Sequence, residues 1–373
     1  MSTVLVTHAD SPLGAMLAER LSATEGVDRV LTPADDDALA AGLRRAERVV
    51  LLASTGTPVA GADRNSTVPL WIAGLFERAE LAGVDHIVAV SSAMVYGAWP
   101  NNAVPLTEAA PLRPNPGLGF AVGLAELERR AGEWKRRSGV PLAVLRPAAT
   151  LLEGETHWLQ RAVSPIADLR ADDQPPVQFL HPDDLADAVA HALRCRLDGT
   201  FNVSPDGWLS GEELRALAGA RPRVRLPGRI AAGLAEVRFR AGLSRTSPGI
   251  LPYVRYPWVV ANDRLRSTGW SPSCSSEEAY VLVHRPTRWE SMSVQRRQDL
   301  ALAAAAAFAA AVTAGIVWLV RRIATDARPR RRARHLSWRP RGIAWARSRS
   351  RRSLGSLRRG SRPRRGEPSR ARR

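Results

Sequence analysis

The sequence contains almost no lysine, since Lys135 is the only one among its 54 lysine and arginine residues. Chemistry that needs a tunable lysine amine, such as Schiff-base formation, therefore has a single candidate. Cysteine is also scarce, because Cys195 and Cys274 are the only two. Two cysteines so far apart in the chain form neither a disulfide framework nor a metal-ligand cluster. We therefore expect no metal site, and a reducing compartment.

Acidic residues are nearly absent from residues 321–373. This segment holds 21 arginines against Asp326 and Glu367, a charge of +19, whereas the whole chain carries +18. Residues 1–320 are therefore almost neutral, at about −1. With so few apolar residues, the segment is expected to be a disordered, arginine-rich tail. Nonspecific nucleic acid, bound by counterion release, is a minor alternative partner for this tail alone.

The N-terminus lacks the pattern of a secretory signal peptide. Residues 1–6 (MSTVLV) have no basic stretch followed by a long apolar run. The short run of apolar and β-branched residues predicts a first β-strand instead. We therefore expect a cytoplasmic domain.

Apolar runs alternate with amphipathic stretches over the first half of the chain. The runs are continuously apolar, which is typical of parallel strands covered by helices on both faces. The predicted strands are residues 4–7, 29–32, 47–53, 86–91, 141–145 and 199–203, and the predicted helices are 13–21, 36–46, 70–82, 124–137 and 183–193. The pattern predicts an α/β fold, a Rossmann-like doubly wound parallel sheet, over residues 1–285. A small C-terminal substrate-side lobe is expected mostly within residues 150–285.

Residues 300–320 form an uncharged stretch after an expected linker at 286–299. Their number fits the roughly 20 residues that cross a membrane, and arginine pairs flank both ends. We interpret them as one apolar helix, either transmembrane or lying in the membrane interface; an alanine-rich helix packed on protein is the alternative. The basic tail and the domain would both prefer the cytoplasmic side, which a single span does not allow. Anionic membrane lipid is the expected partner of residues 300–373.

Six short motifs occur in order between residues 6 and 203. They are VTHADSPLG (6–14), SSAMVYG (91–97), LTE with PLRP (106–108 and 111–114), LRP (145–147), FLHPDDLADA (179–188) and GTFNV (199–203). Together they resemble the extended (atypical) short-chain dehydrogenases/reductases, the NAD-dependent epimerase/dehydratase family, and in particular bacterial UDP-sugar 4-epimerase-like proteins. The resemblance covers residues 1–285. It implies binding of NAD or NADP, a nucleotide-sugar ligand, and a homodimer formed through helices 70–82 and 124–137.

The cofactor turn departs from the G-x-x-G-x-x-G pattern of that family. His8, Ser11 and Gly14 stand at its three glycine positions. Glycine there lets the chain turn tightly and lets a pyrophosphate approach the helix N-terminus. A tight turn at His8 is expected if its φ stays negative. The residues that the resemblance assigns to cofactor binding are Thr7, His8, Ser11, Leu13, Gly14, Ala53 and Pro147; a strand–turn–helix without ligand is the alternative.

The segment after the second strand is short and lacks the usual ribose-binding residue. Thr32 is followed by Pro33, and the next predicted strand begins at Glu47. Because the family fits a helix and a further strand into this interval, we predict that its third strand is missing or vestigial. Asp35 is expected to cap a helix rather than to bind a ribose.

The family's catalytic Tyr-x-x-x-Lys pair is replaced. The AELE motif at 125–128 aligns the segment and puts Phe120 at the tyrosine position and Leu124 at the lysine position. Phenylalanine has no proton to transfer, and leucine has no charge that could shift a pKa. Ser92 matches the third catalytic residue, but a serine alone only positions a substrate. Neither Lys135 nor any other group completes the set.

No second active site emerges from the remaining polar residues. Tyr96, Glu108, His86, His181 and the Asp183–Asp184 pair form no recognisable metal, triad or carboxylate-pair arrangement. We therefore predict a family member with impaired or lost catalysis that acts as a membrane-associated nucleotide- or partner-binding protein. The alternative is an active NAD(P)-dependent nucleotide-sugar epimerase or reductase with a non-standard acid or base.

Overall fold

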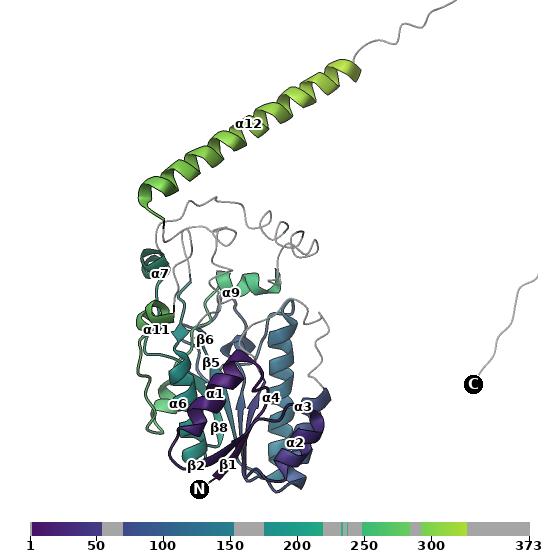
Figure 1. Cartoon of the computed structure of the whole chain (residues 1–373), viewed down its shortest axis with the longest axis vertical. Coiled ribbons are helices and arrows are strands. Elements are labelled where there is room, and N and C mark those ends of the chain that lie inside the picture. The colour runs from purple at the N-terminus through teal and green to yellow at the C-terminus, as the bar shows by residue number, and fades with distance from the viewer. Residues whose placement is uncertain are drawn as a thin grey trace, which may run out of the picture. The chain divides into compact units, whose positions relative to one another are not determined.

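The structure is a computed structural model, drawn in Figure 1. It describes residues 2–53, 70–152, 175–218, 233, 237, 248–283 and 292–326. The chain divides into two compact units, Met1–Ala304 and Ala305–Arg373. The first unit contains the sheet, and the second contains most of the last helix.

A six-stranded parallel sheet is the centre of the first unit. Its order is β2-β1-β3-β4-β5-β8, with β1 Ser2–Val6, β2 Val27–Leu31, β3 Arg48–Leu52, β4 His86–Val90, β5 Leu142–Pro147 and β8 Gly199–Val203. Successive side chains of a strand point to opposite faces. Val50 and Leu52 accordingly lie in one apolar cluster, and Val49 and Leu51 in another. Both faces are buried, so the strands are apolar throughout, and the predicted Rossmann-like α/β fold is confirmed.

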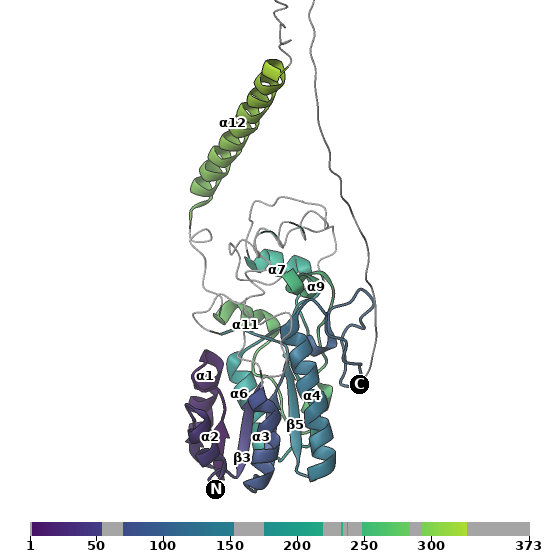
Figure 2. The ribbon, with the colours of Figure 1, turned by 90° about the vertical axis from the view of Figure 1, so that its right-hand side faces the viewer.

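Helices cover the two faces of this sheet, as Figures 1 and 2 show. Helices α1 (Pro12–Ser22) and α6 (Pro182–Arg194) pack together on one face. Helices α2 (Asp36–Leu43), α3 (Leu70–Leu81) and α4 (Gly119–Ser138) cover the other. The first turn of α4 also reaches the cluster on the α1 side through Ala121 and Leu124. This places the N-terminal end of α4 beside the carboxyl ends of the strands.

Strand β2 lies at the edge of the sheet, next to β1. In the common doubly wound order 3-2-1-4-5-6, a further strand lies outside the second one. Here the chain returns through α2 directly to β3, on the other side of β1. Within the described part of the chain no strand pairs with the outer side of β2, as expected if the third strand is missing or vestigial. The topological switch point lies between β1 and β3.

Several short elements follow β5 in the chain besides α6 and β8. Short strands β6 (Ala149–Thr150) and β7 (Phe179–Leu180) pair with each other, and helices α7 (Gly211–Ala218), α9 (Leu251–Arg255), α10 (Asp263–Arg266) and α11 (Ser276–Val283) follow, with a 3-10 turn, η2 (Pro248–Ile250), before α9. Side-chain amides hold this part together: Gln178 exchanges hydrogen bonds with the backbone of Val260, and Asn262 donates to the carbonyl of Ser204. Tyr280 joins the main core.

The predicted apolar stretch at 300–320 lies within α12 (Val294–Asp326), which also takes up the end of the predicted linker. Among the described residues, no helix combines the length and the apolar character needed to cross a membrane. The prediction of a transmembrane span at 300–320 is corrected accordingly. Described side chains of α12 such as Leu302 and Trp318 are exposed. The arginine-rich tail beyond residue 326 lies outside the described residues.

Candidate functional site

The turn between β1 and α1 lies at the switch point and is closed by its own side chains. His8, at the first glycine position, has a φ of 52°, which is the left-handed region that glycine prefers. The turn thus forms although the condition of a negative φ at His8 is not met. The turn keeps the backbone shape of the glycine motif without the glycine, and a residue with a Cβ carries a strain of about 1 kcal/mol or more there.

Ser11, at the second glycine position, is the N-cap of α1. Its hydroxyl donates to the carbonyl oxygen of His8 at 2.7 Å and accepts from the amide of Gly14 at 3.1 Å. The amide of Ser11 also donates to the carbonyl of His8, at 3.0 Å. Both hydrogen-bonding functions of this hydroxyl are used inside the turn.

Gly14, the third glycine position, is required by a close backbone approach. A Cβ placed on Gly14 would lie 2.0 Å from the carbonyl oxygen of His8 and 2.9 Å from the Cα of Ala9. Both neighbours are backbone atoms, so no side-chain movement could relieve the clash. This glycine therefore serves the packing of α1 against its own turn, which needs no ligand.

The other residues assigned to cofactor binding surround this turn. Thr7 is buried, accepting from the amide of Leu52 through its hydroxyl at 2.9 Å and donating its own amide to Val50. Leu13 is buried in the core, Ala53 follows β3, and Pro147 ends β5. Thr7, Leu13 and Ala53 thus cluster at the switch point. They contribute chain pairing and packing there.

The three catalytic positions lie around the carboxyl end of β4. Ser92 is partly buried and caps the 3-10 turn η1 (Ala93–Tyr96), accepting from the amide of Met94 at 3.2 Å. Phe120, in the first turn of α4, packs against the core cluster, and Leu124, one turn later, is 4% exposed within it. This face of α4 is therefore apolar at both positions where the family has its proton-transfer pair.

A buried polar network lies below this face, and reasoning from sequence missed it. Arg146 of β5 donates to Glu128 of α4 at 2.6 Å and to the hydroxyl of Tyr96 at 2.6 Å. Glu128 also accepts from Ser91 at 2.5 Å, and Tyr96 donates to Asn202 of β8 at 2.8 Å. All five side chains are less than 9% exposed. Because burial raises the pKa of Tyr96, its phenol is held neutral rather than poised to transfer a proton.

The five network residues belong to the motifs that carry the family resemblance. Ser91 and Tyr96 lie in SSAMVYG, Glu128 in AELE, Arg146 in LRP and Asn202 in TFNV. The polar residues at or just after the ends of apolar strands, Ser91, Arg146 and Asn202, were the signal that could have revealed the network. These motifs therefore tie β4, α4, β5 and β8 together whether or not the protein is an enzyme.

The remaining polar candidates have structural roles. Glu108 accepts from the amide of Asn202 at 2.8 Å, and His181 caps α6. Asp183 pairs with Arg20 of α1, while Asp184 accepts from the amide and hydroxyl of Ser273. Asp35 caps α2 by accepting from Ala38, as predicted. Over the residues that the structure describes, no group of three potential metal ligands occurs.

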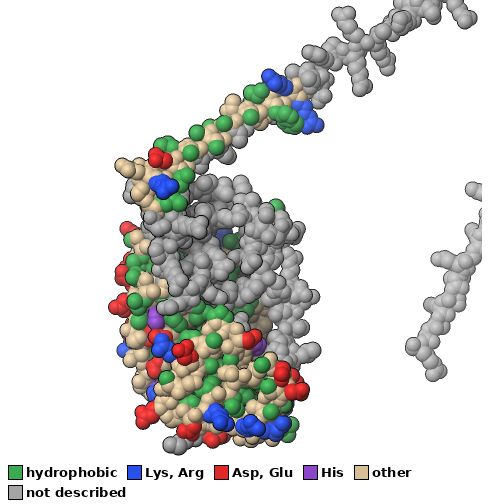
Figure 3. All heavy atoms as spheres, viewed as in Figure 1, with side chains coloured by type: hydrophobic (Ala, Val, Ile, Leu, Met, Phe, Trp, Pro, Cys, Tyr) green, Lys and Arg blue, Asp and Glu red, His purple; other side chains and the backbone are tan. Residues whose placement is uncertain are grey.

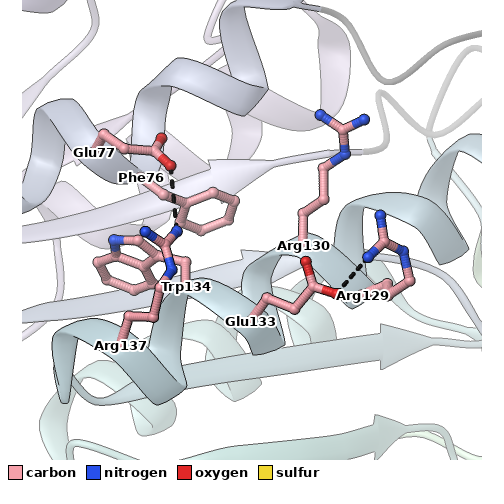
Figure 4. A pocket seen from close by; sticks show the side chains of 7 residues that line it. All are labelled: Phe76, Glu77, Arg129, Arg130, Glu133, Trp134 and Arg137. Atoms are coloured by element: carbon pink, nitrogen blue, oxygen red, sulfur yellow. Dashed lines mark hydrogen bonds and ion pairs between the residues drawn. The ribbon is translucent and has the colours of Figure 1, made fainter.

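A separate hollow lies on the outer face of α3 and α4 (Figure 4). Its volume is about 370 Å³, and it is lined by Phe76, Glu77, Arg129, Arg130, Glu133, Trp134 and Arg137. Each arginine faces a carboxylate: Arg137 contacts Glu77, Arg129 contacts Glu126 and Glu133, and Arg130 contacts Glu126. Hydrogen bonds from Arg129 and Arg130 lower the pKa of Glu126 to about 2. The charges are balanced within the surface, so the hollow is not built to attract an anion.

Comparisons with solved structures identify the fold. UDP-glucose 4-epimerase of Thermus thermophilus, in complex with NAD, is 20% identical, with a TM-score of 0.55 over 75% of this chain and 97% of that one. UDP-glucuronic acid 4-epimerase of Bacillus cereus, in complex with UDP-glucuronic acid and NAD, is 14% identical, with a TM-score of 0.57 over 75% and 97%.

The dTDP-glucose 4,6-dehydratase DesIV of Streptomyces venezuelae, with NAD and TYD bound, is 18% identical, with a TM-score of 0.54 over 75% and 97%. No protein-family model and no curated protein matches the sequence. The structural likenesses show that the chain has the fold of the extended short-chain dehydrogenases and nucleotide-sugar epimerases, as the motif order predicted.

Proposed function

We propose that this protein is a catalytically silent relative of the nucleotide-sugar epimerases and dehydratases, which acts by binding a nucleotide-type ligand or a protein partner. One observation carries the proposal: the α4 face at the carboxyl end of β4 presents Phe120 and Leu124. A hydride transfer at a sugar carbon needs a group that moves the hydroxyl proton. Neither side chain can accept or donate one.

The surrounding residues support this assignment. Ser92 has a hydroxyl but caps η1, and Tyr96 is buried under Arg146 and Asn202. Tyr253 of α9 reaches the same region, but its hydroxyl donates to the carbonyl of Met94 at 2.8 Å and its side chain is fully buried. Burial raises its pKa. Neither of these two buried phenols thus replaces the missing acid and base.

Purified full-length protein tests the proposal in a turnover assay. UDP- and dTDP-hexoses are incubated with the protein and NAD or NADP, and sugar products are separated by chromatography. We expect no conversion above the buffer blank. Robust conversion that is lost in Ser92→Ala would refute the proposal and establish the alternative, an active epimerase or reductase with a non-standard acid or base.

A variant that restores the acid–base pair extends the same assay. Phe120→Tyr with Leu124→Lys restores the acid–base pair on one face of α4, four residues apart. The matched control is Phe120→Leu with Leu124→Met, which changes the same positions without adding a proton donor. Both variants are first compared with wild type for folding by circular dichroism, because Leu124 is a core residue.

The proposed setting is the cytoplasmic surface of an anionic membrane, with α12 lying along it. Figure 3 shows apolar side chains along α12 and basic side chains near both of its ends. The exposed apolar residues include Leu302, Ile316 and Trp318, and Arg322 stacks over the Trp318 ring at 5.2 Å. Exposed apolar area together with positive charge favours interfacial binding. A chain ending at residue 291 and the full chain are compared by sedimentation with vesicles with and without phosphatidylserine; equal sedimentation would contradict this setting.

Two further partners remain predictions. The homodimer would use the outer face of α3 and α4, where carboxylates and guanidinium groups alternate. Nonspecific nucleic acid would use the arginine-rich tail. Sedimentation equilibrium of the full chain measures the homodimer. Repeating it with added DNA at low and high salt measures binding of nucleic acid.

A further inference from the structure

We infer that the turn at residues 7–14 does not hold the pyrophosphate of a dinucleotide, so that the cofactor implied by the fold does not fit this site. The inference deepens the proposed function, since a silent enzyme could still retain NAD in a structural role. The inference rests on the proposed function only in taking the protein to be catalytically inactive. The geometry of the turn itself closes the site.

The N-terminus of α1 has few amide groups left for a ligand. A pyrophosphate is held at such a terminus by backbone N–H groups that have no partner inside the helix. Pro12, the first helical residue, has no N–H. The N–H of Gly14 is bonded to the hydroxyl of Ser11. Of the first three helical positions, only the N–H of Leu13 is left.

The hydroxyl of Ser11 also occupies the space that a phosphate oxygen would need. It accepts from the Gly14 amide at 3.1 Å while its proton goes to the carbonyl of His8 at 2.7 Å. An oxygen acceptor is therefore already seated on the helix terminus. In the glycine motif, the second glycine leaves this position open, so that the backbone can approach the pyrophosphate.

No arginine or lysine in the turn compensates for the missing amide donors. Asp10 is exposed within the turn, and its carboxylate opposes an incoming diphosphate. After β2, where the ribose would be read, Asp35 is bonded to the amide of Ala38 as the cap of α2. Among the described strands, none lies outside β2. Both the diphosphate and the ribose therefore lack the groups that hold them in the dinucleotide fold.

The test measures NAD and NADP binding by full-length protein with isothermal titration calorimetry, together with an assay for NAD(H) released on denaturation of the purified protein. We expect neither saturable binding at millimolar NAD nor stoichiometric release. Saturable binding or release from wild type would overturn the inference. The proposed loss of catalysis would then still stand unless turnover is also found, so the two failures are distinguishable.

Opening the turn provides the second arm. Ser11→Gly frees the Gly14 amide, and Pro12→Ala adds an amide at the first helical position. Each regained donor to a charged phosphate should improve NAD affinity by about tenfold, so the double variant should bind measurably. The matched control is Asp35→Gly, which removes the helix cap of α2. It should leave the affinity for NAD unchanged. If the folded double variant binds no better than wild type, the turn is not what closes the site, and the inference fails.

Discussion

Replacing Glu128 by glutamine tests the buried ion pair that joins α4 to β5. Glu128 and Arg146 are 5% and 7% exposed at their side chains, with a 2.6 Å contact. Glutamine keeps the shape but leaves the guanidinium of Arg146 buried without its counter-charge. Breaking a buried pair from one side costs about 3–5 kcal/mol. For a domain of this size, that lowers the melting temperature by roughly 10 °C.

The same helix supplies a matched control two residues away. Glu126 also contacts arginines, Arg129 and Arg130, but on the exposed surface of α4. Surface pairs contribute about 0–1 kcal/mol, so Glu126→Gln should shift the melting temperature by only a few degrees. Thermal and urea unfolding followed by circular dichroism measure the melting temperature and the free energy of unfolding of both variants.

A third variant separates the cost of an unpaired buried charge from the loss of the ion pair as a whole. Glu128→Gln with Arg146→Met removes both charges, so it should recover part of the stability lost in Glu128→Gln alone. The reasoning is refuted if Glu128→Gln costs no more than Glu126→Gln. It is also refuted if adding Arg146→Met to Glu128→Gln lowers stability by the full cost of a second independent substitution.

Three further predictions concern the turn after β1 and His86, the first residue of β4. Gly14→Ala should lower the free energy of unfolding by about 1–3 kcal/mol or more, because the new Cβ would meet the His8 carbonyl at 2.0 Å; a smaller loss in urea unfolding would contradict this. His8→Gly should leave stability unchanged or raise it by up to about 1 kcal/mol, since relief of the positive φ offsets the entropy of glycine; clear destabilisation would show that the imidazole has a needed role. Burial lowers the pKa of His86, so the folded state favours the neutral ring, and its stabilising contribution is present above pH about 6.5 and lost as the pH falls further. The unfolding free energy of wild type should therefore fall more steeply between pH 7 and 5 than that of His86→Gln, and parallel curves would contradict this.

The sheet and most of its helices could be predicted from sequence because local rules determine them. Continuous apolar runs indicated strands buried on both faces, and the two core clusters on either side of the sheet bear this out. The short interval between Thr32 and Glu47 indicated a missing strand, and Asp35 indicated a helix cap. Each inference needed only residues that are near one another in the chain.

The details of the site depend on backbone geometry and long-range contacts that short sequence patterns do not encode, and these escaped prediction. His8 adopts a positive φ although histidine disfavours it, and its carbonyl oxygen lies against Gly14. The Arg146–Tyr96–Asn202 network joins residues up to 106 positions apart. Single motifs announced neither feature. The apolar stretch at 300–320 was recognised as a helix, but its apolar character was overestimated.

The short sheet leaves β2 with one side unpaired, and this has a consequence for how molecules of this protein meet. An open strand edge is a template on which another chain can add a strand and begin to aggregate. In β2, the exposed residues Asp28 and Arg29 stand at the second and third of its five positions. Charged side chains on an edge strand disfavour pairing with a further strand. Asp28 and Arg29 therefore protect this border of the sheet against the addition of another chain.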